Sequence, residues 1–275
     1  MDTTWQVPGH VLGREAARDE LGIVVPGVSL ARGESVLVRI VTGPERQEHD
    51  DLDRLTGLEM DHLVPLIDVL PAADTGGLDG SPGVATGWGG ARGDEVAAAL
   101  VYRDLEGTPL AELVGAGESL SVGEAVGVFE PIARALAGLH ALGLRHGFVR
   151  TGSIVIDADG VPWLAAVGAS QAAGWTGALH DDVAELAHLV TTTSALRVEP
   201  DALADADALA GHLAAAGEPR RLRRGGSSET PFDLAGRMRA AAREPLPGDP
   251  QEPPAATSRT SRRSGGHPSR RDGGA

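Results

Sequence analysis

The sequence predicts an α+β fold, with strands in the first third of the chain and helices in the rest. Three observations lead to this prediction. Short runs of β-branched and apolar residues lie between turn residues up to Leu105, one long helix with clear start and stop signals follows, and a stretch rich in Pro, Gly, Ser and Arg comes last. With 275 residues, 41% of them hydrophobic, the chain is long enough for one domain with a sizeable core.

Three runs in the first part are predicted to be strands. Residues 36–41 read VLVRIV, residues 63–70 read LVPLIDVL and residues 98–105 read AALVYRDL, and each is bounded by charged or turn residues. Between the first two, residues 44–58 carry leucines at threefold spacing on a charged background, which favours a short amphipathic helix. Residues 72–94 are rich in Gly and Asp, so we expect a long loop there.

The clearest helix in the sequence begins after Ser121. Ser121 and Glu124 form a capping box, in which the hydroxyl and the carboxylate bond free amide groups at the helix start. An apolar stripe with a period of 3.6 residues follows, made of Ala125, Val128, Phe129, Ile132, Leu136 and Leu139. Gly143 is suited to end this helix.

Residues 153–168 predict a β-hairpin. Apolar runs lie on both sides of a turn signal that runs from Asp157 to Gly160. We expect Asp157 and Asp159 to bond backbone amides in this turn, because a calcium loop needs further ligands at set spacing. Three helices are expected downstream: one that starts at Asp181 or Asp182 and continues through Val190, one over about 201–216 and one over about 231–243.

Composition excludes several kinds of chemistry. All 24 basic residues are arginine, so no lysine is available, and the absence of cysteine excludes disulfides, thiolate zinc sites and a cysteine nucleophile. Residues 1–218 contain 12 arginines and 33 acidic residues, whereas residues 219–275 contain 12 arginines and 6 acidic residues. The acidic body argues against nucleic acid as a partner. The basic tail is expected to be a solvated linker that could contact acidic surfaces.

The N-terminal sequence MDTTWQVPGH has no basic stretch followed by an apolar one, and no later run offers about 18 uninterrupted apolar residues. We therefore expect a soluble, cytoplasmic protein with no membrane span. Residues 1–243 are expected to be ordered and residues 244–275 to be disordered.

Several segments resemble those of protein kinases in their order and spacing. ARGESVLVRIV (31–41) resembles the segment that ends in V-A-I-K, and LVYRDLEGTPLAELV (100–114) resembles the hinge and the helix after it. ALAGLHALGLRHGFVRTGSIVI (135–156) resembles the region of the H-R-D-L-x-x-x-N catalytic loop, and WLAAVGAS (163–170) stands where D-F-G belongs. The segments at 54–70, 181–190 and 227–241 are similar to the helix C to strand 4 region, the start of helix F and the closing helix.

The resemblance is to a degenerate bacterial Ser/Thr protein kinase, and it covers about residues 1–243. It implies a bilobal protein-kinase-like fold. The small, β-rich N-lobe would span about 1–103 and the mostly helical C-lobe about 104–243, followed by the tail over 244–275. A five-stranded sheet is expected in the N-lobe.

The resemblance also implies that phosphoryl transfer is lost. Phe148 stands at the position of the catalytic aspartate and cannot accept a proton, while Ser153 and Ala166 replace the two residues that hold magnesium. REAARDEL (14–21) replaces the glycine-rich loop, and its acidic residues would repel phosphates. Only 12 residues, 169–180, separate the D-F-G position from the start of helix F, too few for an ordinary activation segment. No catalytic residues and no metal ligands are therefore expected.

A nucleotide pocket stays possible under the resemblance. Arg39 takes the position of the phosphate-gripping lysine, and Glu48 is its expected ion-pair partner. Tyr102 and Asp104 belong to the expected hinge. The alternative is that Arg39 and Glu48 are surface residues with no relation to nucleotide.

Four functions stay open at this point. The first is a pseudokinase that acts as a regulatory or scaffolding module and binds protein partners. The second is a sensor that binds ATP without magnesium, and the third is an atypical Ser/Thr kinase with rearranged catalytic residues. The fourth is an α/β binding protein of unrelated fold. His140 and His146 could suggest metal or acid–base chemistry, but we expect them to pack or to form hydrogen bonds.

Overall fold

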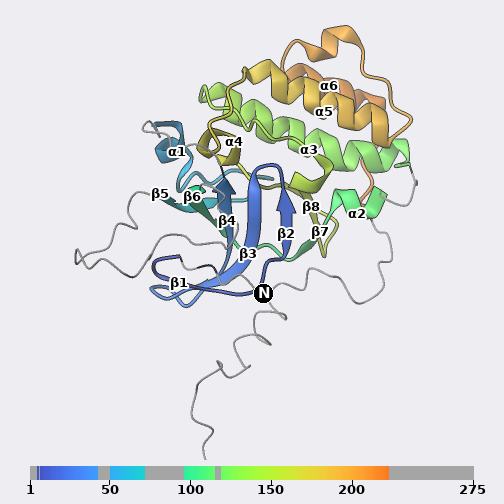
Figure 1. Cartoon of the computed structure of the whole chain (residues 1–275). Helices are drawn as coiled ribbons and strands as arrows, with labels where there is room; N and C mark the ends of the chain where they lie inside the picture. Colours follow the sequence, from blue (N-terminus) through green and yellow to red (C-terminus); the bar gives the residue numbers. More distant parts are fainter. Residues whose placement is uncertain (1–4, 6, 43–49, 72–95, 115–118, 223–275) are drawn as a thin grey trace, which may run out of the picture. The chain divides into compact units, whose positions relative to one another are not determined.

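Figure 1 shows the fold in a computed structural model, which describes residues 5, 7–42, 50–71, 96–114 and 119–222. Within these residues the protein is α+β, with an antiparallel sheet first and helices afterwards, as the sequence predicts. Glu48, the loop expected over 72–94, the helix expected over 231–243 and the tail over 244–275 lie outside the described residues.

The first part of the chain forms an antiparallel sheet. Its strands are β1 (His10–Leu12), β2 (Ala17–Asp19), β3 (Gly22–Ser29), β4 (Ser35–Thr42), β5 (Leu66–Pro71) and β6 (Val96–Arg103). The order across the sheet is β1-β3-β4-β6-β5, and β2 also pairs with β3. Strands β4, β5 and β6 confirm the three predicted strands, because each overlaps one predicted apolar run.

Strands β1 and β2 occupy the same edge of β3, with a break between Leu12 and Ala17. Pro26 of β3 faces this break, since its carbonyl accepts a hydrogen bond from the amide of Gly13 at 2.8 Å. The amide and carbonyl of one strand residue point to the same side, so the missing N–H of Pro26 removes no bond to β4. The sequence does not predict β3, because its GIVVPGVS segment contains proline and glycines that usually interrupt strands.

Helix α1 (Asp50–Leu55) connects β4 to β5 and is shorter than the predicted helix over 44–58. Its buried side chains are Leu52 and Leu55, and three aspartates lie in its first turn, where they interact well with the helix dipole. The helix ends before Gly57, which has a φ of +76°.

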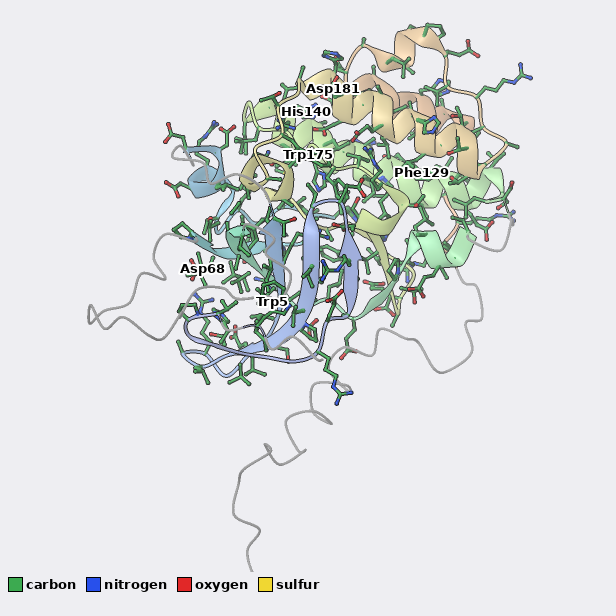
Figure 2. The ribbon with its side chains drawn as sticks, in the orientation of Figure 1. Trp5, Asp68, Phe129, His140, Trp175 and Asp181 are labelled. Carbon is green, nitrogen blue, oxygen red and sulfur yellow. The ribbon has the colours of Figure 1, made fainter. Side chains whose placement is uncertain are left out.

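After α2 (Leu110–Val114), the long helix α3 (Val122–Ala141) confirms the clearest prediction. The Glu124 carboxylate accepts a hydrogen bond from the Ser121 amide at 2.8 Å, which completes the capping box. All six residues of the predicted apolar stripe are buried. Phe129 points from α3 into the core (Figure 2). Gly143, with a φ of +71°, follows the helix end as predicted.

The predicted hairpin forms from β8 (Ile154–Asp157) and β9 (Pro162–Leu164), preceded by the short 3-10 helix η2 (Thr151–Ser153). The carboxylate of Asp157 accepts hydrogen bonds from the amides of Asp159 and Val161 at 2.9 and 2.8 Å, so it orders the turn as expected. The additional strand β7 (Gly107–Pro109) pairs with β8 and was not expected from the sequence.

The remaining elements are α4 (Ala169–Ala172), α5 (Leu179–Thr193), the 3-10 helix η3 (Pro200–Leu203) and α6 (Ala206–Ala216). Helix α5 starts before both predicted caps: Asp181 bonds the Ala178 amide at 2.7 Å, whereas Asp182 is fully buried. The helix predicted over 201–216 is two elements, because Asp205 caps a new helix by accepting a bond from the Ala208 amide at 2.8 Å.

Two apolar clusters stabilise this arrangement. The larger joins one face of the sheet to α1, α3, α5 and α6, and the smaller covers the other face of the sheet around Trp5, Ile23 and Val38. In Figure 1, α5 and α6 lie beside α3, in agreement with their contacts. Within the described part of the chain, no helix has the length and apolar character needed to cross a membrane.

Candidate functional site

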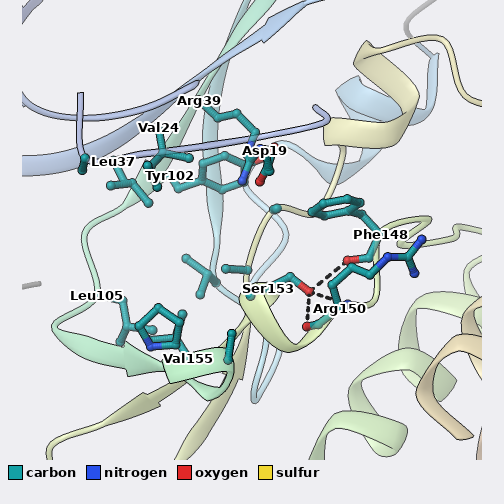
Figure 3. Close-up of a pocket in the computed structure, with 18 of the residues that line it drawn as sticks. Asp19, Val24, Leu37, Arg39, Tyr102, Leu105, Phe148, Arg150, Ser153 and Val155 are labelled. Carbon is teal, nitrogen blue, oxygen red and sulfur yellow. Dashed lines mark hydrogen bonds and ion pairs between the residues drawn. The ribbon is translucent and has the colours of Figure 1, made fainter. Parts of the chain in front are cut away.

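A cavity of about 480 Å³ is lined by residues of β2, β3, β4, β6, β8 and α2 (Figure 3). Its apolar walls are formed by Val24, Leu37, Val64, Leu105 and Val155. The volume lies within the range of small-molecule sites, which are mostly apolar with a few polar groups. The cavity is therefore the candidate site.

Five of the seven predicted site residues line this cavity: Arg39, Tyr102, Phe148, Ser153 and Ala166. They come from positions far apart in the sequence, and the fold brings them together. Glu48 lies outside the described residues. Asp104 does not line the cavity, although its neighbours Arg103 and Leu105 do.

Arg39 reaches the cavity from the middle of β4 and is largely buried. Its Nη1 lies 2.6 Å from Oδ1 of Asp19, which comes from the end of β2. The same carboxylate oxygen accepts a hydrogen bond from the Leu21 amide at 3.0 Å, so the turn into β3 fixes its position. Among the described residues, the ion-pair partner of Arg39 is Asp19, and the expected pairing with Glu48 lies outside these residues.

Phe148 is buried beside Arg39. The Cζ atom of Arg39 lies 5.9 Å from the centre of the Phe148 ring, and the Cζ atom of Arg150 lies 5.7 Å from it. The ring of Trp175 packs edge-on against Phe148, with 6.0 Å between the ring centres. Cation–π attraction and ring packing thus hold an apolar group at this position, where no proton can be accepted.

Ser153 uses its hydroxyl within the loop that carries Phe148. The oxygen accepts a hydrogen bond from the Arg150 amide at 2.9 Å, and the hydroxyl lies 2.9 Å from the carbonyl oxygens of Phe148 and Arg150 (Figure 3). The side chain is buried. A hydroxyl with these partners stabilises the loop and leaves little capacity for a further ligand.

Ala166 lines the cavity with a φ of +71°, a value that is uncommon for residues other than glycine. The next residue, Val167, accepts a hydrogen bond through its carbonyl from the Tyr102 hydroxyl at 2.8 Å. This bond joins strand β6 to the segment after β9. Burial raises the pKa of the Tyr102 hydroxyl well above its ordinary value, with Arg39 opposing the shift, so Tyr102 acts as a neutral donor.

Asp104 follows β6 and is partly buried. Its Oδ1 atom is inaccessible to solvent and has no hydrogen-bond partner among the described residues. Burial, followed by the charge of Glu106, raises the pKa of Asp104 above its ordinary value. Among the described residues, Asp104 therefore makes no contact that would support its expected position in a nucleotide pocket.

The loop that carries Phe148 is held by a buried hydrogen-bond network centred on Asp182 of α5. Asp182 accepts hydrogen bonds from the amides of His146 and Gly147 at 2.8 and 2.6 Å, and its Oδ2 lies 3.0 Å from Nε2 of His140. Burial alone would raise the pKa of Asp182, but these hydrogen bonds outweigh burial and hold it below the ordinary value. Both histidines have the hydrogen-bonding positions that we expected.

His146 is fully buried. Its Nε2 lies 3.0 Å from the Ala165 carbonyl and its Nδ1 accepts from the Phe148 amide at 3.2 Å, a pattern that fits the neutral ring. Burial lowers the pKa of His146, and the nearby charge of Asp182 opposes the shift. His146 is therefore a structural group at neutral pH.

Searches with this sequence returned no matching family model and no matching curated protein.

Magnesium and a nucleoside triphosphate fit these residues poorly. Ala166 offers no side-chain oxygen, and the hydroxyl of Ser153 is already bonded. Within the ranges that the structure describes, no group of three or more His, Cys, Asp or Glu side chains could hold a metal ion. The cavity also has acidic residues, Asp19 and Glu20, on the strand end that faces it.

Sequence reasoning missed two residues of the site. It noted the acidic character of residues 14–21 but not that Asp19 would pair with Arg39. The sequence indicates Asp182 as a candidate helix cap, whereas its carboxylate bonds the backbone amides of His146 and Gly147. The adjacent residues Asp181 and Asp182 were a signal for this role, since one of two aspartates at a helix start can cap the helix while the other points inward.

Proposed function

We propose that this chain is a protein-kinase-like domain that does not transfer phosphate and acts as a regulatory or scaffolding module for a protein partner. The proposal joins the sequence resemblance to the chemistry of the cavity.

Support for the kinase-like fold comes from the arrangement of the elements. The antiparallel sheet has six strands, one more than the expected five, because β1 and β2 pair with successive parts of β3 along the same edge. A helix lies between β4 and β5, and a hairpin follows the long helix α3. The cavity lies between residues of the sheet and residues of the later elements. These features occur in the order that the resemblance implies.

The observation that carries the loss of transfer is the position of Phe148. Transfer of a phosphoryl group needs a group that accepts or orients the substrate hydroxyl, together with charges that stabilise the transition state. At this position the cavity instead has a buried ring between Arg39 and Arg150. Asp19, the carboxylate that pairs with Arg39, is bonded to that guanidinium and to the Leu21 amide.

Transfer is tested by incubating the full chain with labelled ATP, a generic protein substrate and either magnesium or manganese. We expect no labelled protein, and no gain in intact mass that corresponds to a phosphoryl group. A Phe148→Asp variant serves as the matched control, because it returns a carboxylate to the same position. Labelling by the natural chain above the level of a reaction without the chain would falsify the loss of activity, whatever the level that the Phe148→Asp variant reaches.

A chain without transfer acts through binding, and among the described residues Trp175 is the exposed aromatic side chain that a partner could contact. It is 37% exposed and lies in the segment between α4 and α5, where its ring contacts Phe148. Exposed aromatic side chains are enriched at protein interfaces. A partner that contacts Trp175 would thus be coupled to the cavity through a single ring contact.

Partner binding is tested by quantitative affinity capture with the full chain from its native cell extract. Trp175→Ala should reduce the recovery of a specific partner severalfold. Leu203→Ala is the control, because Leu203 is similarly exposed, at 40%, but lies on η3. Equal recovery with both variants would contradict the role of Trp175, and thermal unfolding of each variant separates lost binding from lost folding.

A sensor that binds ATP without metal is the alternative candidate. The apolar walls of the cavity favour it, whereas Asp19 and Glu20 in the lining oppose the binding of phosphates. Thermal unfolding with ATP, with and without magnesium, tests it. Stabilisation beyond that produced by an equal ionic strength of salt would favour this candidate over a purely protein-binding module.

A further inference from the structure

The charged residues that line the cavity differ in whether they have an ion-pair partner. Its lining includes four arginines, and each of them forms an ion pair: Arg18 with Glu15, Arg39 with Asp19, Arg103 with Glu59 and Arg150 with Glu185. None of these guanidinium groups is therefore an uncompensated positive charge. A polyanion entering the cavity would have to displace a carboxylate from its arginine.

The acidic residues of the lining behave differently. Asp19 is paired with Arg39, but Glu20 and Glu112 have no ion pair among the described residues. Both are exposed, so they lie at the opening of the cavity, Glu20 after β2 and Glu112 on α2. Two uncompensated negative charges thus flank an apolar interior.

The aromatic ring in the lining already has two cations near it. Phe148 has the guanidinium of Arg39 and that of Arg150 near its ring, so it offers little cation–π attraction to a ligand. A cationic group would gain most at the opening, near the two glutamates. An apolar body would gain most inside, against Val24, Leu37 and Val155.

From this arrangement we propose that the cavity is a binding site for a small organic cation, an amine or guanidine on an apolar body, and that it rejects nucleotide polyphosphates. The apolar body fills the interior and the cationic group lies between Glu20 and Glu112. The inference does not rest on the proposed kinase-like function, since it uses only the lining residues and their ion pairs.

Three probes with one body and three charges test the proposal on the full chain: naphthylmethylamine, naphthylmethanol and naphthoate, substituted at the same ring position. Affinity is measured by calorimetry at low ionic strength. With two carboxylates at the opening, the amine should bind about tenfold more tightly than the alcohol, and the naphthoate should bind most weakly. At about 0.5 M salt the advantage of the amine should shrink, because exposed charges are screened.

The Glu20→Gln/Glu112→Gln variant should bring the amine to within about twofold of the alcohol, since both attracting charges are removed. The matched control is Glu34→Gln/Glu199→Gln, which removes two exposed carboxylates that do not line the cavity. In the control the preference for the amine should persist. Because all four glutamates are exposed, we expect each variant to unfold at nearly the natural temperature.

Three results would overturn the proposal. One is a naphthoate or ATP that binds as tightly as the amine. Another is an advantage of the amine that survives equally in both double variants. The last is the absence of binding by all three naphthyl probes up to millimolar concentration, because an accessible apolar cavity of this volume should accept at least one of them.

Discussion

The carboxylate of Asp182, fully buried on α5, accepts a hydrogen bond from the Gly147 amide at 2.6 Å. It also bonds the amide of His146 and the ring of His140. One side chain therefore satisfies the backbone of the loop that carries Phe148 and ties that loop to two helices. The loop has a fixed position even though it holds none of the groups needed for transfer.

Asp182→Asn should be strongly destabilising. The amide group is similar in shape to the carboxylate, but its NH₂ cannot accept a hydrogen bond and it carries no charge. We expect a loss of about 3–5 kcal/mol in the free energy of unfolding, the usual cost of breaking a buried charged network. Urea unfolding measures this loss, and Asp201→Asn on the exposed surface of η3 should change stability by less than about 0.5 kcal/mol.

Gly147→Ala should cost more than Gly143→Ala, although the two glycines have almost the same backbone conformation, with φ of +74° and +71°. Both substitutions force a residue with a Cβ into the left-handed region, which costs about 1–2 kcal/mol. At Gly147 the new Cβ would also overlap the Ser170 hydroxyl and the Arg145 guanidinium, whereas at Gly143 it would meet open space. We expect an extra loss of about 1–3 kcal/mol at Gly147 from this crowding. Equal losses in chemical unfolding would show that the neighbours of Gly147 move aside freely.

Acid should destabilise the protein through His146. Its pKa is lowered in the folded state, so the unfolded chain binds a proton more readily. The stability contributed by the neutral ring is fully present above the unfolded pKa, near 6.5, and is lost as the pH falls below that value. His146→Gln keeps a donor near the Ala165 carbonyl but does not titrate. Between pH 7.5 and pH 5, the natural chain should lose more unfolding free energy than this variant, and parallel pH profiles would contradict the assignment.

Tyr102→Phe should lower stability by about 1–3 kcal/mol, because the carbonyl of Val167 loses its donor in a buried place while the ring stays packed. Thermal and urea unfolding measure the change. A loss below about 0.3 kcal/mol would mean that water replaces the hydroxyl.

Local patterns explain which parts of the fold could be predicted. The capping box of α3, its apolar stripe and the turn at Asp157 depend on residues a few positions apart, so the sequence alone indicates them. β3 escaped prediction because Pro26 is tolerated only through a break in the neighbouring edge, which depends on the pairing of β1 and β2.

In the site, too, some features follow from local sequence and others depend on contacts between distant segments. Position along the chain was enough to choose Arg39, Phe148, Ser153 and Ala166, and all of them line one cavity. The partner of Arg39 could not be chosen in this way. Asp19 is twenty residues away and reaches Arg39 only because β2, β3 and β4 are neighbours in the sheet. The pairing of every lining arginine with a carboxylate likewise depends on contacts between distant segments.

Tyr102 is the single tyrosine of the chain, and its hydroxyl is sealed between β6 and the segment after β9. A phenol in water ionises near pH 10 and then absorbs at longer wavelength. In the folded protein this colour change should be delayed until the two segments separate. The chain therefore contains its own optical reporter of the contact between the sheet and the segment after β9, readable without any label.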